Sequence, residues 1–262
     1  MTTTIGIFDS GFGGLTVYRE LKNLSNYRFI YFADMARTPY GNKTSSQIQE
    51  MSSEITEFLQ SLHIQALVIA CHTASTQAYD YLNATLSIPI ISAHLPTESL
   101  INEHSSKQSF LILGTEATIR SSYYQKAIRN YNPSAVIQPI ACPQIVKYIQ
   151  EENQSIDELE AILDHYEIGK DPFDVILLAC THFPLIQASI QKRYLPSTII
   201  LDPAKKMKEA LDSLSLPPSL TPIDKDLFYV SGNPTSFEAF AEKVIGEKIV
   251  CSSHLNHTCV KI

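Results

Sequence analysis

Two short apolar runs that end in cysteine constrain the fold of this chain more than any other feature. Residues 66–70 read A-L-V-I-A and lead into C-H-T, and residues 175–179 read V-I-L-L-A and lead into C-T-H. Aliphatic runs bounded by polar residues are typical of strands buried on both faces of a parallel sheet. Ligands bind beyond the carboxyl ends of such strands. We therefore expect Cys71 and Cys180 at a binding site.

The two cysteines carry more information as a pair than either carries alone. A single free cysteine is usually a small, buried core residue. The matching contexts A-C-H-T and A-C-T-H favour a functional pair, and they lie about one domain length apart in the sequence. We predict two similar α/β halves that face each other, each presenting one thiol to a shared cleft.

The rest of the chain alternates predicted strands with predicted helices, a pattern typical of parallel sheets with right-handed crossovers. Residues 4–8 form an apolar strand, followed by Asp9, Ser10, the turn G-F-G-G and a helix over 15–21. Free amides at a helix N-terminus suit a carboxylate or phosphate. The alternative role for Asp9 is a helix cap. Farther along, we predict single helices over 121–130 and 184–194.

Composition and charge exclude several classes of protein. The chain has 20 basic and 27 acidic residues, a net charge of −7, which argues against a nucleic-acid-binding surface. Its apolar runs are far shorter than the ~20 residues that span a bilayer, so no membrane partner is expected. The N-terminus has no basic segment followed by an apolar one and is not a signal peptide, so we expect a cytoplasmic protein.

The cysteines predict neither a disulfide framework nor a metal site. There are five, with no C-x-x-C pair, as expected for reduced cytosolic thiols. Between Cys251 and Cys259 the sequence reads C-x₂-H-x₂-H-x-C, with His254 and His257. This spacing matches no common zinc pattern.

Five motifs taken together resemble bacterial glutamate racemase, of the aspartate/glutamate racemase superfamily. They follow that family's order and spacing, and the likeness covers nearly the whole chain. The motifs are D-S-G-F-G-G-L-T-V (9–17), A-D-M-A-R-T-P-Y-G (33–41), I-A-C-H-T-A-S (69–75), L-G-T-E-A-T (113–118) and A-C-T-H-F-P-L (179–185).

The resemblance implies an α/β fold of two pseudo-symmetric domains with mainly parallel sheets and the active site in the cleft between them. The first domain would span residues 1–95 and about 207–262, and the second about 96–206. The implied reaction is a cofactor-independent interconversion of L-glutamate and D-glutamate. It would supply D-glutamate for peptidoglycan synthesis, and hence for cell wall biogenesis and cell shape. A homodimer is left open, because the family is often dimeric.

Racemisation requires acid/base groups on opposite faces of the substrate's α-carbon, and Cys71 and Cys180 meet this demand. A thiolate is a workable base if nearby donors lower its pKa. By resemblance, Cys71 deprotonates D-glutamate and Cys180 deprotonates L-glutamate, with Asp9 assisting Cys71 and His182 assisting Cys180. The alternative for His182 is a buried core imidazole.

Substrate contacts are also implied by the resemblance. Hydroxyl groups and backbone amides suit carboxylates without adding a competing charge. No metal or other cofactor is expected. The implied substrate-binding residues are Ser10, Pro39, Tyr40, Gly41, His72, Thr73, Thr115, Thr118 and Thr181.

Two positions depart from the family pattern. The family's usual Asn after the first catalytic cysteine is His72 here, which is larger and can charge near neutral pH. A glutamate is expected near the start of the E-E pair, where this chain reads Gln150, Glu151 and Glu152. We expect position 72 to alter substrate affinity or the pH profile without abolishing turnover.

Two other functions remain open from the sequence. One is a related enzyme such as an aspartate racemase, which equal activity on aspartate and glutamate would favour. The other is a degenerate glutamate-binding protein that lost turnover through His72. Retention of both cysteines, Asp9 and His182 argues against it. Glutamate binding without exchange of its α-proton would support it.

Overall fold

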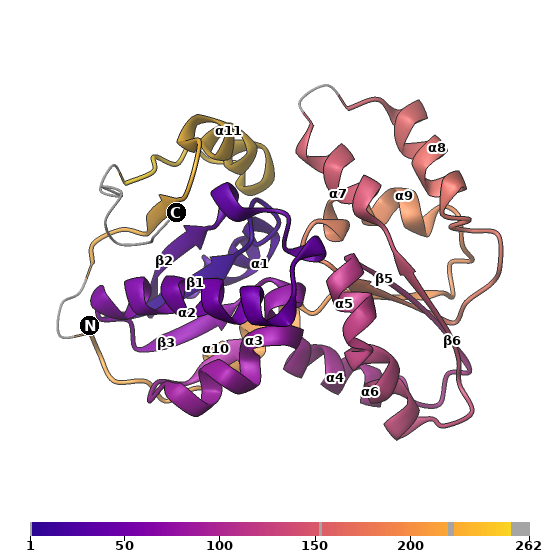
Figure 1. Ribbon diagram of the computed structural model, residues 1–262, viewed down its shortest axis with the longest axis horizontal. Helices are drawn as coiled ribbons and strands as arrows, with labels where there is room; N and C mark the ends of the chain where they lie inside the picture. Colours follow the sequence, from indigo (N-terminus) through magenta and orange to yellow (C-terminus); the bar gives the residue numbers. More distant parts are fainter. Residues whose placement is uncertain (1, 152–153, 220–222, 253–262) are drawn as a thin grey trace.

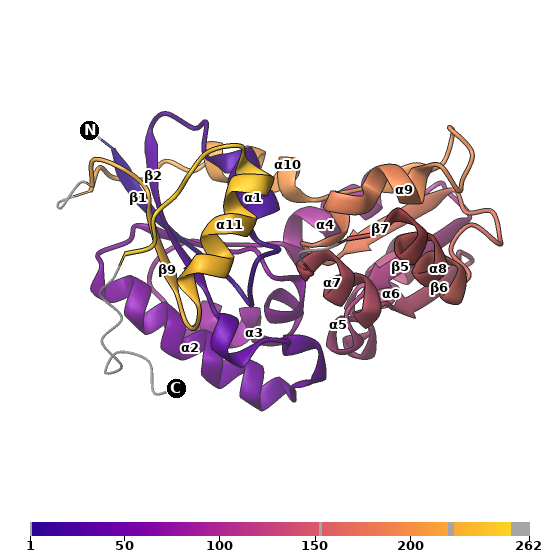
Figure 2. The ribbon, with the colours of Figure 1, turned by 90° about the horizontal axis from the view of Figure 1, so that it is seen from above.

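The computed structural model describes residues 2–151, 154–219 and 223–252, which form two parallel β-sheets, each flanked by helices. Figure 1 shows the two sheets side by side, each with its own set of helices, and Figure 2 shows the same division from above. The predicted α/β class with parallel sheets is thus confirmed. One sheet has five strands in the order β4-β3-β1-β2-β9, and the other has four in the order β6-β5-β7-β8.

The first sheet is built around β1, whose seven residues are all buried. It pairs in parallel with β2 on one side and β3 on the other, and β9 joins from the C-terminal part of the chain by pairing with β2. The strands are β1 (Thr3–Asp9), β2 (Tyr27–Ala33), β3 (Ala66–Ile69), β4 (Ile90–Ser92) and β9 (Leu227–Val230).

Alternate residues of β1 enter different cores, because successive side chains of a strand point to opposite faces of the sheet. Ile5 and Ile7 pack with the core under one layer of helices, and Phe8 packs with the core under the other. The first layer comprises α1 (Leu15–Leu21), α10 (Ala204–Asp212) and α11 (Pro234–Ile245). The second comprises α2 (Ser45–Ser61) and α3 (His72–Thr85).

The second sheet repeats this layered plan around β5 and β7. Leu111 and Leu113 of β5 face one core, and Phe110 and Ile112 face the other. Its strands are β5 (Ser109–Gly114), β6 (Val136–Ala141), β7 (Val175–Ala179) and β8 (Ile199–Leu201). The first core holds α7 (Pro143–Gln150), α8 (Ile156–His165) and α9 (Gln187–Gln191), and the second holds α4 (His94–Glu103), α5 (Glu116–Ser121) and α6 (Tyr123–Tyr131).

Two helix predictions were wrong in the same way, because each spans a break. The segment predicted as one helix over 121–130 falls in α5 and α6, separated at Ser122, whose φ of 56° is left-handed. The helix predicted over 184–194 is a 3₁₀ turn (Phe183–Ile186) followed by α9. At that junction Ile186 has a φ of −115°, outside the helical range.

The domain limits at 95/96 and about 206/207 remain a prediction, although β9 and α11 do pack on the first sheet. His254, His257 and Cys259 lie outside the described residues. Within the described ranges, no helix is both long and apolar enough to cross a membrane.

Candidate active site

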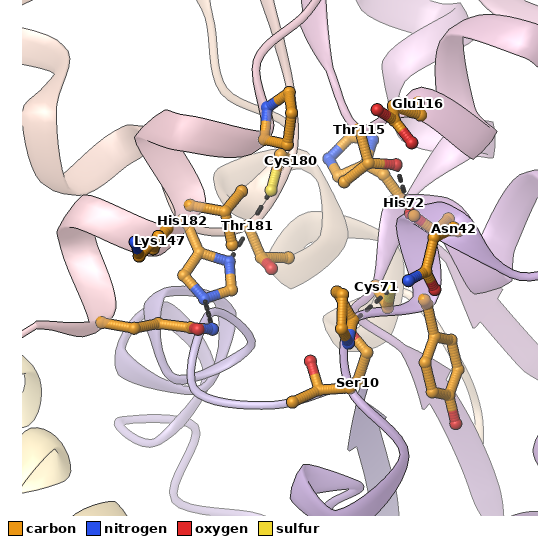
Figure 3. A pocket seen from close by; sticks show the side chains of 18 residues that line it. Ser10, Asn42, Cys71, His72, Thr115, Glu116, Lys147, Cys180, Thr181 and His182 are labelled. Atoms are coloured by element: carbon orange, nitrogen blue, oxygen red, sulfur yellow. Dashed lines mark hydrogen bonds between the residues drawn. The ribbon is translucent and has the colours of Figure 1, made fainter. Parts of the chain in front are cut away.

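A cavity of about 460 Å³ lies where strands of both sheets end. Ser10 follows β1 and Cys71 follows β3, while Thr115 follows β5 and Cys180 follows β7, and all four side chains line this cavity. Figure 3 shows Cys71 and Cys180 entering it from different parts of the chain. The two apolar runs thus bring their cysteines to one site.

Cys71 is the N-cap residue of α3. Its Sγ lies 3.5 Å from Ser10 Oγ. Burial, with the nearby charge of Asp9, raises the pKa of Cys71 to about 11, and hydrogen bonds from Ser10 and the Ala74 amide oppose this only in part. The expected donors are present, but burial outweighs them. Cys71 is therefore a thiol at neutral pH.

Cys180 is equally enclosed. Only 6% of its surface is exposed, and its Sγ lies 3.7 Å from His182 Nδ1. Burial raises the pKa of Cys180 above its ordinary value, and the negative charges of an ionised Cys71 and of Asp9 act in the same direction. The site therefore holds two thiols rather than a thiol and a thiolate.

His182 is buried, but it also lines the cavity and contacts Cys180, so it is more than a core imidazole. Its Nδ1 faces Cys180 Sγ, and its Nε2 lies 3.0 Å from Gln150 Nε2. Burial lowers the pKa of His182 to about 4. The ring is consequently neutral at physiological pH and can donate one hydrogen bond and accept another.

Asp9 is fully buried and lies behind the cavity wall rather than on it. Its Oδ1 accepts the Gly11 amide proton at 2.9 Å, and its Oδ2 accepts the Thr181 hydroxyl proton at 3.1 Å. Burial raises its pKa to about 6, and hydrogen bonds from Gly11, Thr181 and Gly14 limit the rise. Asp9 therefore fixes the glycine-rich turn and also reaches a residue of the other sheet.

His72 is the first residue of α3 and lines the cavity. Its Nδ1 lies 2.6 Å from Tyr124 Oη. Burial lowers the pKa of His72 to about 3, and the nearby His94 contributes in the same direction. The expectation that His72 charges near neutral pH was therefore wrong, because the sequence did not reveal how deeply the ring is buried.

A threonine cluster joins the two halves beside the cysteines. Thr73 Oγ1 lies 2.8 Å from Thr115 Oγ1 and 3.1 Å from Thr118 Oγ1, and the last two are 3.0 Å apart. Thr73, Thr115 and Thr181 line the cavity, whereas Thr118 does not line it and contacts Thr73 and Thr115 from behind.

The loop after β2 forms another wall of the cavity. Pro39, Tyr40 and Gly41 all line it, the last two within a 3₁₀ turn (Tyr40–Asn42). The Tyr40 hydroxyl donates to Asp34 Oδ2 at 2.5 Å, so this ring is held by a buried carboxylate.

Sequence reasoning missed part of the wall. Gln150 also lines the cavity, and the residues that the sequence did not single out are Thr38, Asn42, Glu116, Pro143, Val146 and Lys147. The last three belong to α7, and the C-P pair after β6 was the available signal, since it marks another strand end at the same edge. Glu116 and Lys147 are the formally charged side chains among the described lining residues. Among residues 2–151, 154–219 and 223–252, no group of three or more His, Cys, Asp or Glu residues could hold a metal ion.

Comparisons with known proteins identify the family of this chain. A family described as Asp/Glu/hydantoin racemase matches residues 13–207. The glutamate racemase of Pediococcus pentosaceus is 32% identical over 252 residues, covering 94% of this chain and 95% of the relative. A solved glutamate racemase isoform of Bacillus anthracis matches with a TM-score of 0.84 at 28% identity, covering 96% and 98% of the two chains. A glutamate racemase of Francisella tularensis, solved in complex with D-glutamate, gives a TM-score of 0.83 at 30% identity and 95% coverage of both chains.

Proposed function

The chain belongs to the glutamate racemases, isomerases within the Asp/Glu/hydantoin racemase family, and from this premise we propose that it interconverts L-glutamate and D-glutamate. The observation that carries the mechanism is that Cys71 and Cys180, from different sheets, line one cavity. One sulfur on each face of the α-carbon is the arrangement that a two-base racemisation requires.

Each turnover moves one proton off the substrate and one onto it. For D-glutamate, the Cys71 thiolate removes the α-proton and becomes a thiol, and the Cys180 thiol delivers its proton to the opposite face and becomes a thiolate. For L-glutamate the two cysteines exchange roles. The carbanion between these steps requires no redox change, and both transfers are made by side chains of the chain itself.

The resting thiols must be activated when substrate enters. A positive charge within about 4–6 Å of a sulfur lowers its pKa, and the α-ammonium group of glutamate brings such a charge to the cavity. We propose that Asp9 assists Cys71 and that His182 assists Cys180, the latter through the 3.7 Å contact of Nδ1 with Sγ. Because burial raises the thiol pKa values, one thiol loses its proton to solvent only when substrate binds, and the other remains a thiol.

Fixed dipoles suit the negative charge that develops on the substrate. The hydroxyls of Thr73, Thr115 and Thr181 line the cavity, and the N-terminus of the 14-residue α3 begins at His72. Helix N-termini and hydroxyl donors stabilise carboxylates and developing anions in an enclosed site. His72 is neutral and hydrogen-bonded to Tyr124, so it adds no charge to the cavity.

The biological role and assembly belong to the same proposal. D-Glutamate made by this chain would enter peptidoglycan synthesis in the cytoplasm and so contribute to the cell wall and cell shape. A homodimer is the assembly that the family resemblance suggests, and light scattering of the purified chain tests it. We propose a first domain of residues 1–95 and about 207–262 and a second domain of about 96–206.

The direct test follows the optical activity of either glutamate enantiomer during incubation with the purified chain. We expect both to reach the same racemic mixture, with much slower change for aspartate. Cys71→Ser and Cys180→Ser should each lower kcat by at least about 100-fold, the lower range of acid–base contributions. Cys142→Ser is the matched control, because Cys142 is buried but does not line the cavity. Equal rates on aspartate would reassign the substrate, and an unaffected cysteine variant would refute the two-base mechanism.

A further inference from the structure

We propose that Gln150 is a positioning residue that keeps the proton of His182 on Nδ1, directed at the Cys180 sulfur. Its catalytic consequence rests on the proposed racemase function. The tautomer itself is a property of the resting protein and is measured without substrate.

The geometry at the ring assigns the proton. Gln150 Nε2 lies 3.0 Å from His182 Nε2, and His182 Nδ1 lies 3.7 Å from Cys180 Sγ. An amide nitrogen carries two protons and only donates. A ring nitrogen that faces it at hydrogen-bond distance must therefore accept and bear no proton. A neutral imidazole has one ring proton, so that proton is on Nδ1.

The surroundings of the His182 ring keep it neutral and restrict which of its two nitrogens carries the proton. Only 4% of the His182 surface is exposed. On the Nδ1 side, the backbone of Gly13 approaches so closely that an added Cβ would lie 2.5 Å from Nδ1. Neither Gly13 nor Gln150 carries a charge that would stabilise an imidazolium. The Gln150 amide is thus the group that selects between the two neutral tautomers.

The selected tautomer matters for chemistry at Cys180. A protonated Nδ1 donates toward Sγ, and a donor favours the thiolate over the thiol. The thiolate is the form that Cys180 takes after it delivers a proton or before it removes one. If Gln150 were replaced by the glutamate that the family resemblance leads one to expect, the carboxylate would only accept. It would draw the proton to Nε2 and leave Nδ1 bare in the neutral ring.

The test is ¹⁵N NMR of protein labelled at histidine, with the His182 signals assigned by their loss in His182→Asn. In the wild type we expect an unprotonated Nε2 and a protonated Nδ1, which differ widely in ¹⁵N shift. In Gln150→Glu we expect a protonated Nε2. Gln144→Glu is the matched control, because it adds the same charge to α7 at an exposed residue that does not line the cavity. It should leave the His182 signals unchanged.

Kinetics supply the second readout. Gln150→Met, which keeps the length of the side chain but cannot donate, should lower kcat on the order of tenfold, the effect of one lost hydrogen bond. The fall in kcat/KM must be equal for both enantiomers, because their equilibrium constant is fixed.

A protonated Nε2 in the wild type would overturn the proposal, and so would a Gln150→Met variant with unchanged His182 signals and unchanged kcat. A wild-type chain with the expected signals but no turnover would refute the proposed function and leave the tautomer assignment standing.

Discussion

Burial shifts the pKa values of the buried acid–base residues at this site. It raises the pKa values of Asp9 and Cys71 to about 6 and about 11 and lowers those of His72 and His182 to about 3 and about 4. The sequence identified these residues from their motifs, but it did not reveal their charge. Burial depth depends on packing between distant segments, such as the Thr181–Asp9 hydrogen bond across 172 residues.

Asp9 makes stability depend on pH with a definite sign. Its native pKa of about 6 lies above the ordinary 3.8, so the native state binds more protons than the unfolded state in that window. The free energy of unfolding therefore falls as pH rises through it, by about 3 kcal/mol for two pKa units. Asp9→Asn removes this dependence. The free energy of unfolding of the variant, relative to that of the wild type, should therefore increase as pH rises from 3.8 to about 6.

Urea unfolding across that pH range measures the difference. Asp171→Asn, at an exposed residue between α8 and β7, serves as the control and should follow the wild type. A constant difference between Asp9→Asn and wild type at all pH values would contradict the raised pKa.

The His72–Tyr124 contact predicts a coupled pair. His72→Asn should lose the 2.6 Å bond and lower the free energy of unfolding by about 1–3 kcal/mol, the cost of disrupting a buried polar contact. Tyr124→Phe should lower the free energy of unfolding by less in the His72→Asn variant than in the wild type. Because His72 is neutral, the variant should change KM while the pH profile of kcat/KM near neutrality stays the same. Additive costs in denaturant unfolding, measured as a double-mutant cycle, would argue against the coupling.

At the scale of elements, the strands were easier to predict than the helix ends. Continuous apolar runs identify β3 and β7 because both faces of each are buried. The break between α5 and α6 was missed, because Ser122 gives no sequence signal for its positive φ. Likewise, nothing in the sequence of α7 indicated that its last residue, Gln150, would reach His182.

Gly13 sets how closely the turn before α1 approaches the residues that follow β7 of the second sheet. A Cβ there would lie 2.2 Å from Thr181 Oγ1 and 2.5 Å from His182 Nδ1, so Gly13→Ala must displace both. We expect kcat/KM to fall by about 100-fold, the effect of an error of about 1 Å in position. Gly6→Ala is the control, because its Cβ meets Ile64 in the core of the first sheet. Gly6→Ala should lower the melting temperature, and its kcat/KM should fall much less than that of Gly13→Ala. Equal losses of kcat/KM in both variants would contradict the role of Gly13.

At the scale of the whole molecule, the site exists only where the two sheets meet. Thr16 of α1 donates to the Thr181 carbonyl at 2.9 Å, and the Thr181 hydroxyl donates to Asp9, so residues after β7 are fastened to the first sheet. Figure 2 shows α7 at the edge of the second half that faces the first. The sequence predicted such a cleft because its two cysteine motifs follow equivalent strands. Its depth and the donors behind it required the packed structure.

The central claim, one proton-transfer sulfur on each side of the substrate, is tested most directly by ¹H NMR of glutamate α-proton exchange in D₂O. Wild type should exchange the α-proton of both enantiomers and racemise them. Cys180→Ser should exchange D-glutamate alone and Cys71→Ser should exchange L-glutamate alone, each without inversion, because one base remains on one face. Continued racemisation by either variant at the wild-type rate would contradict the account.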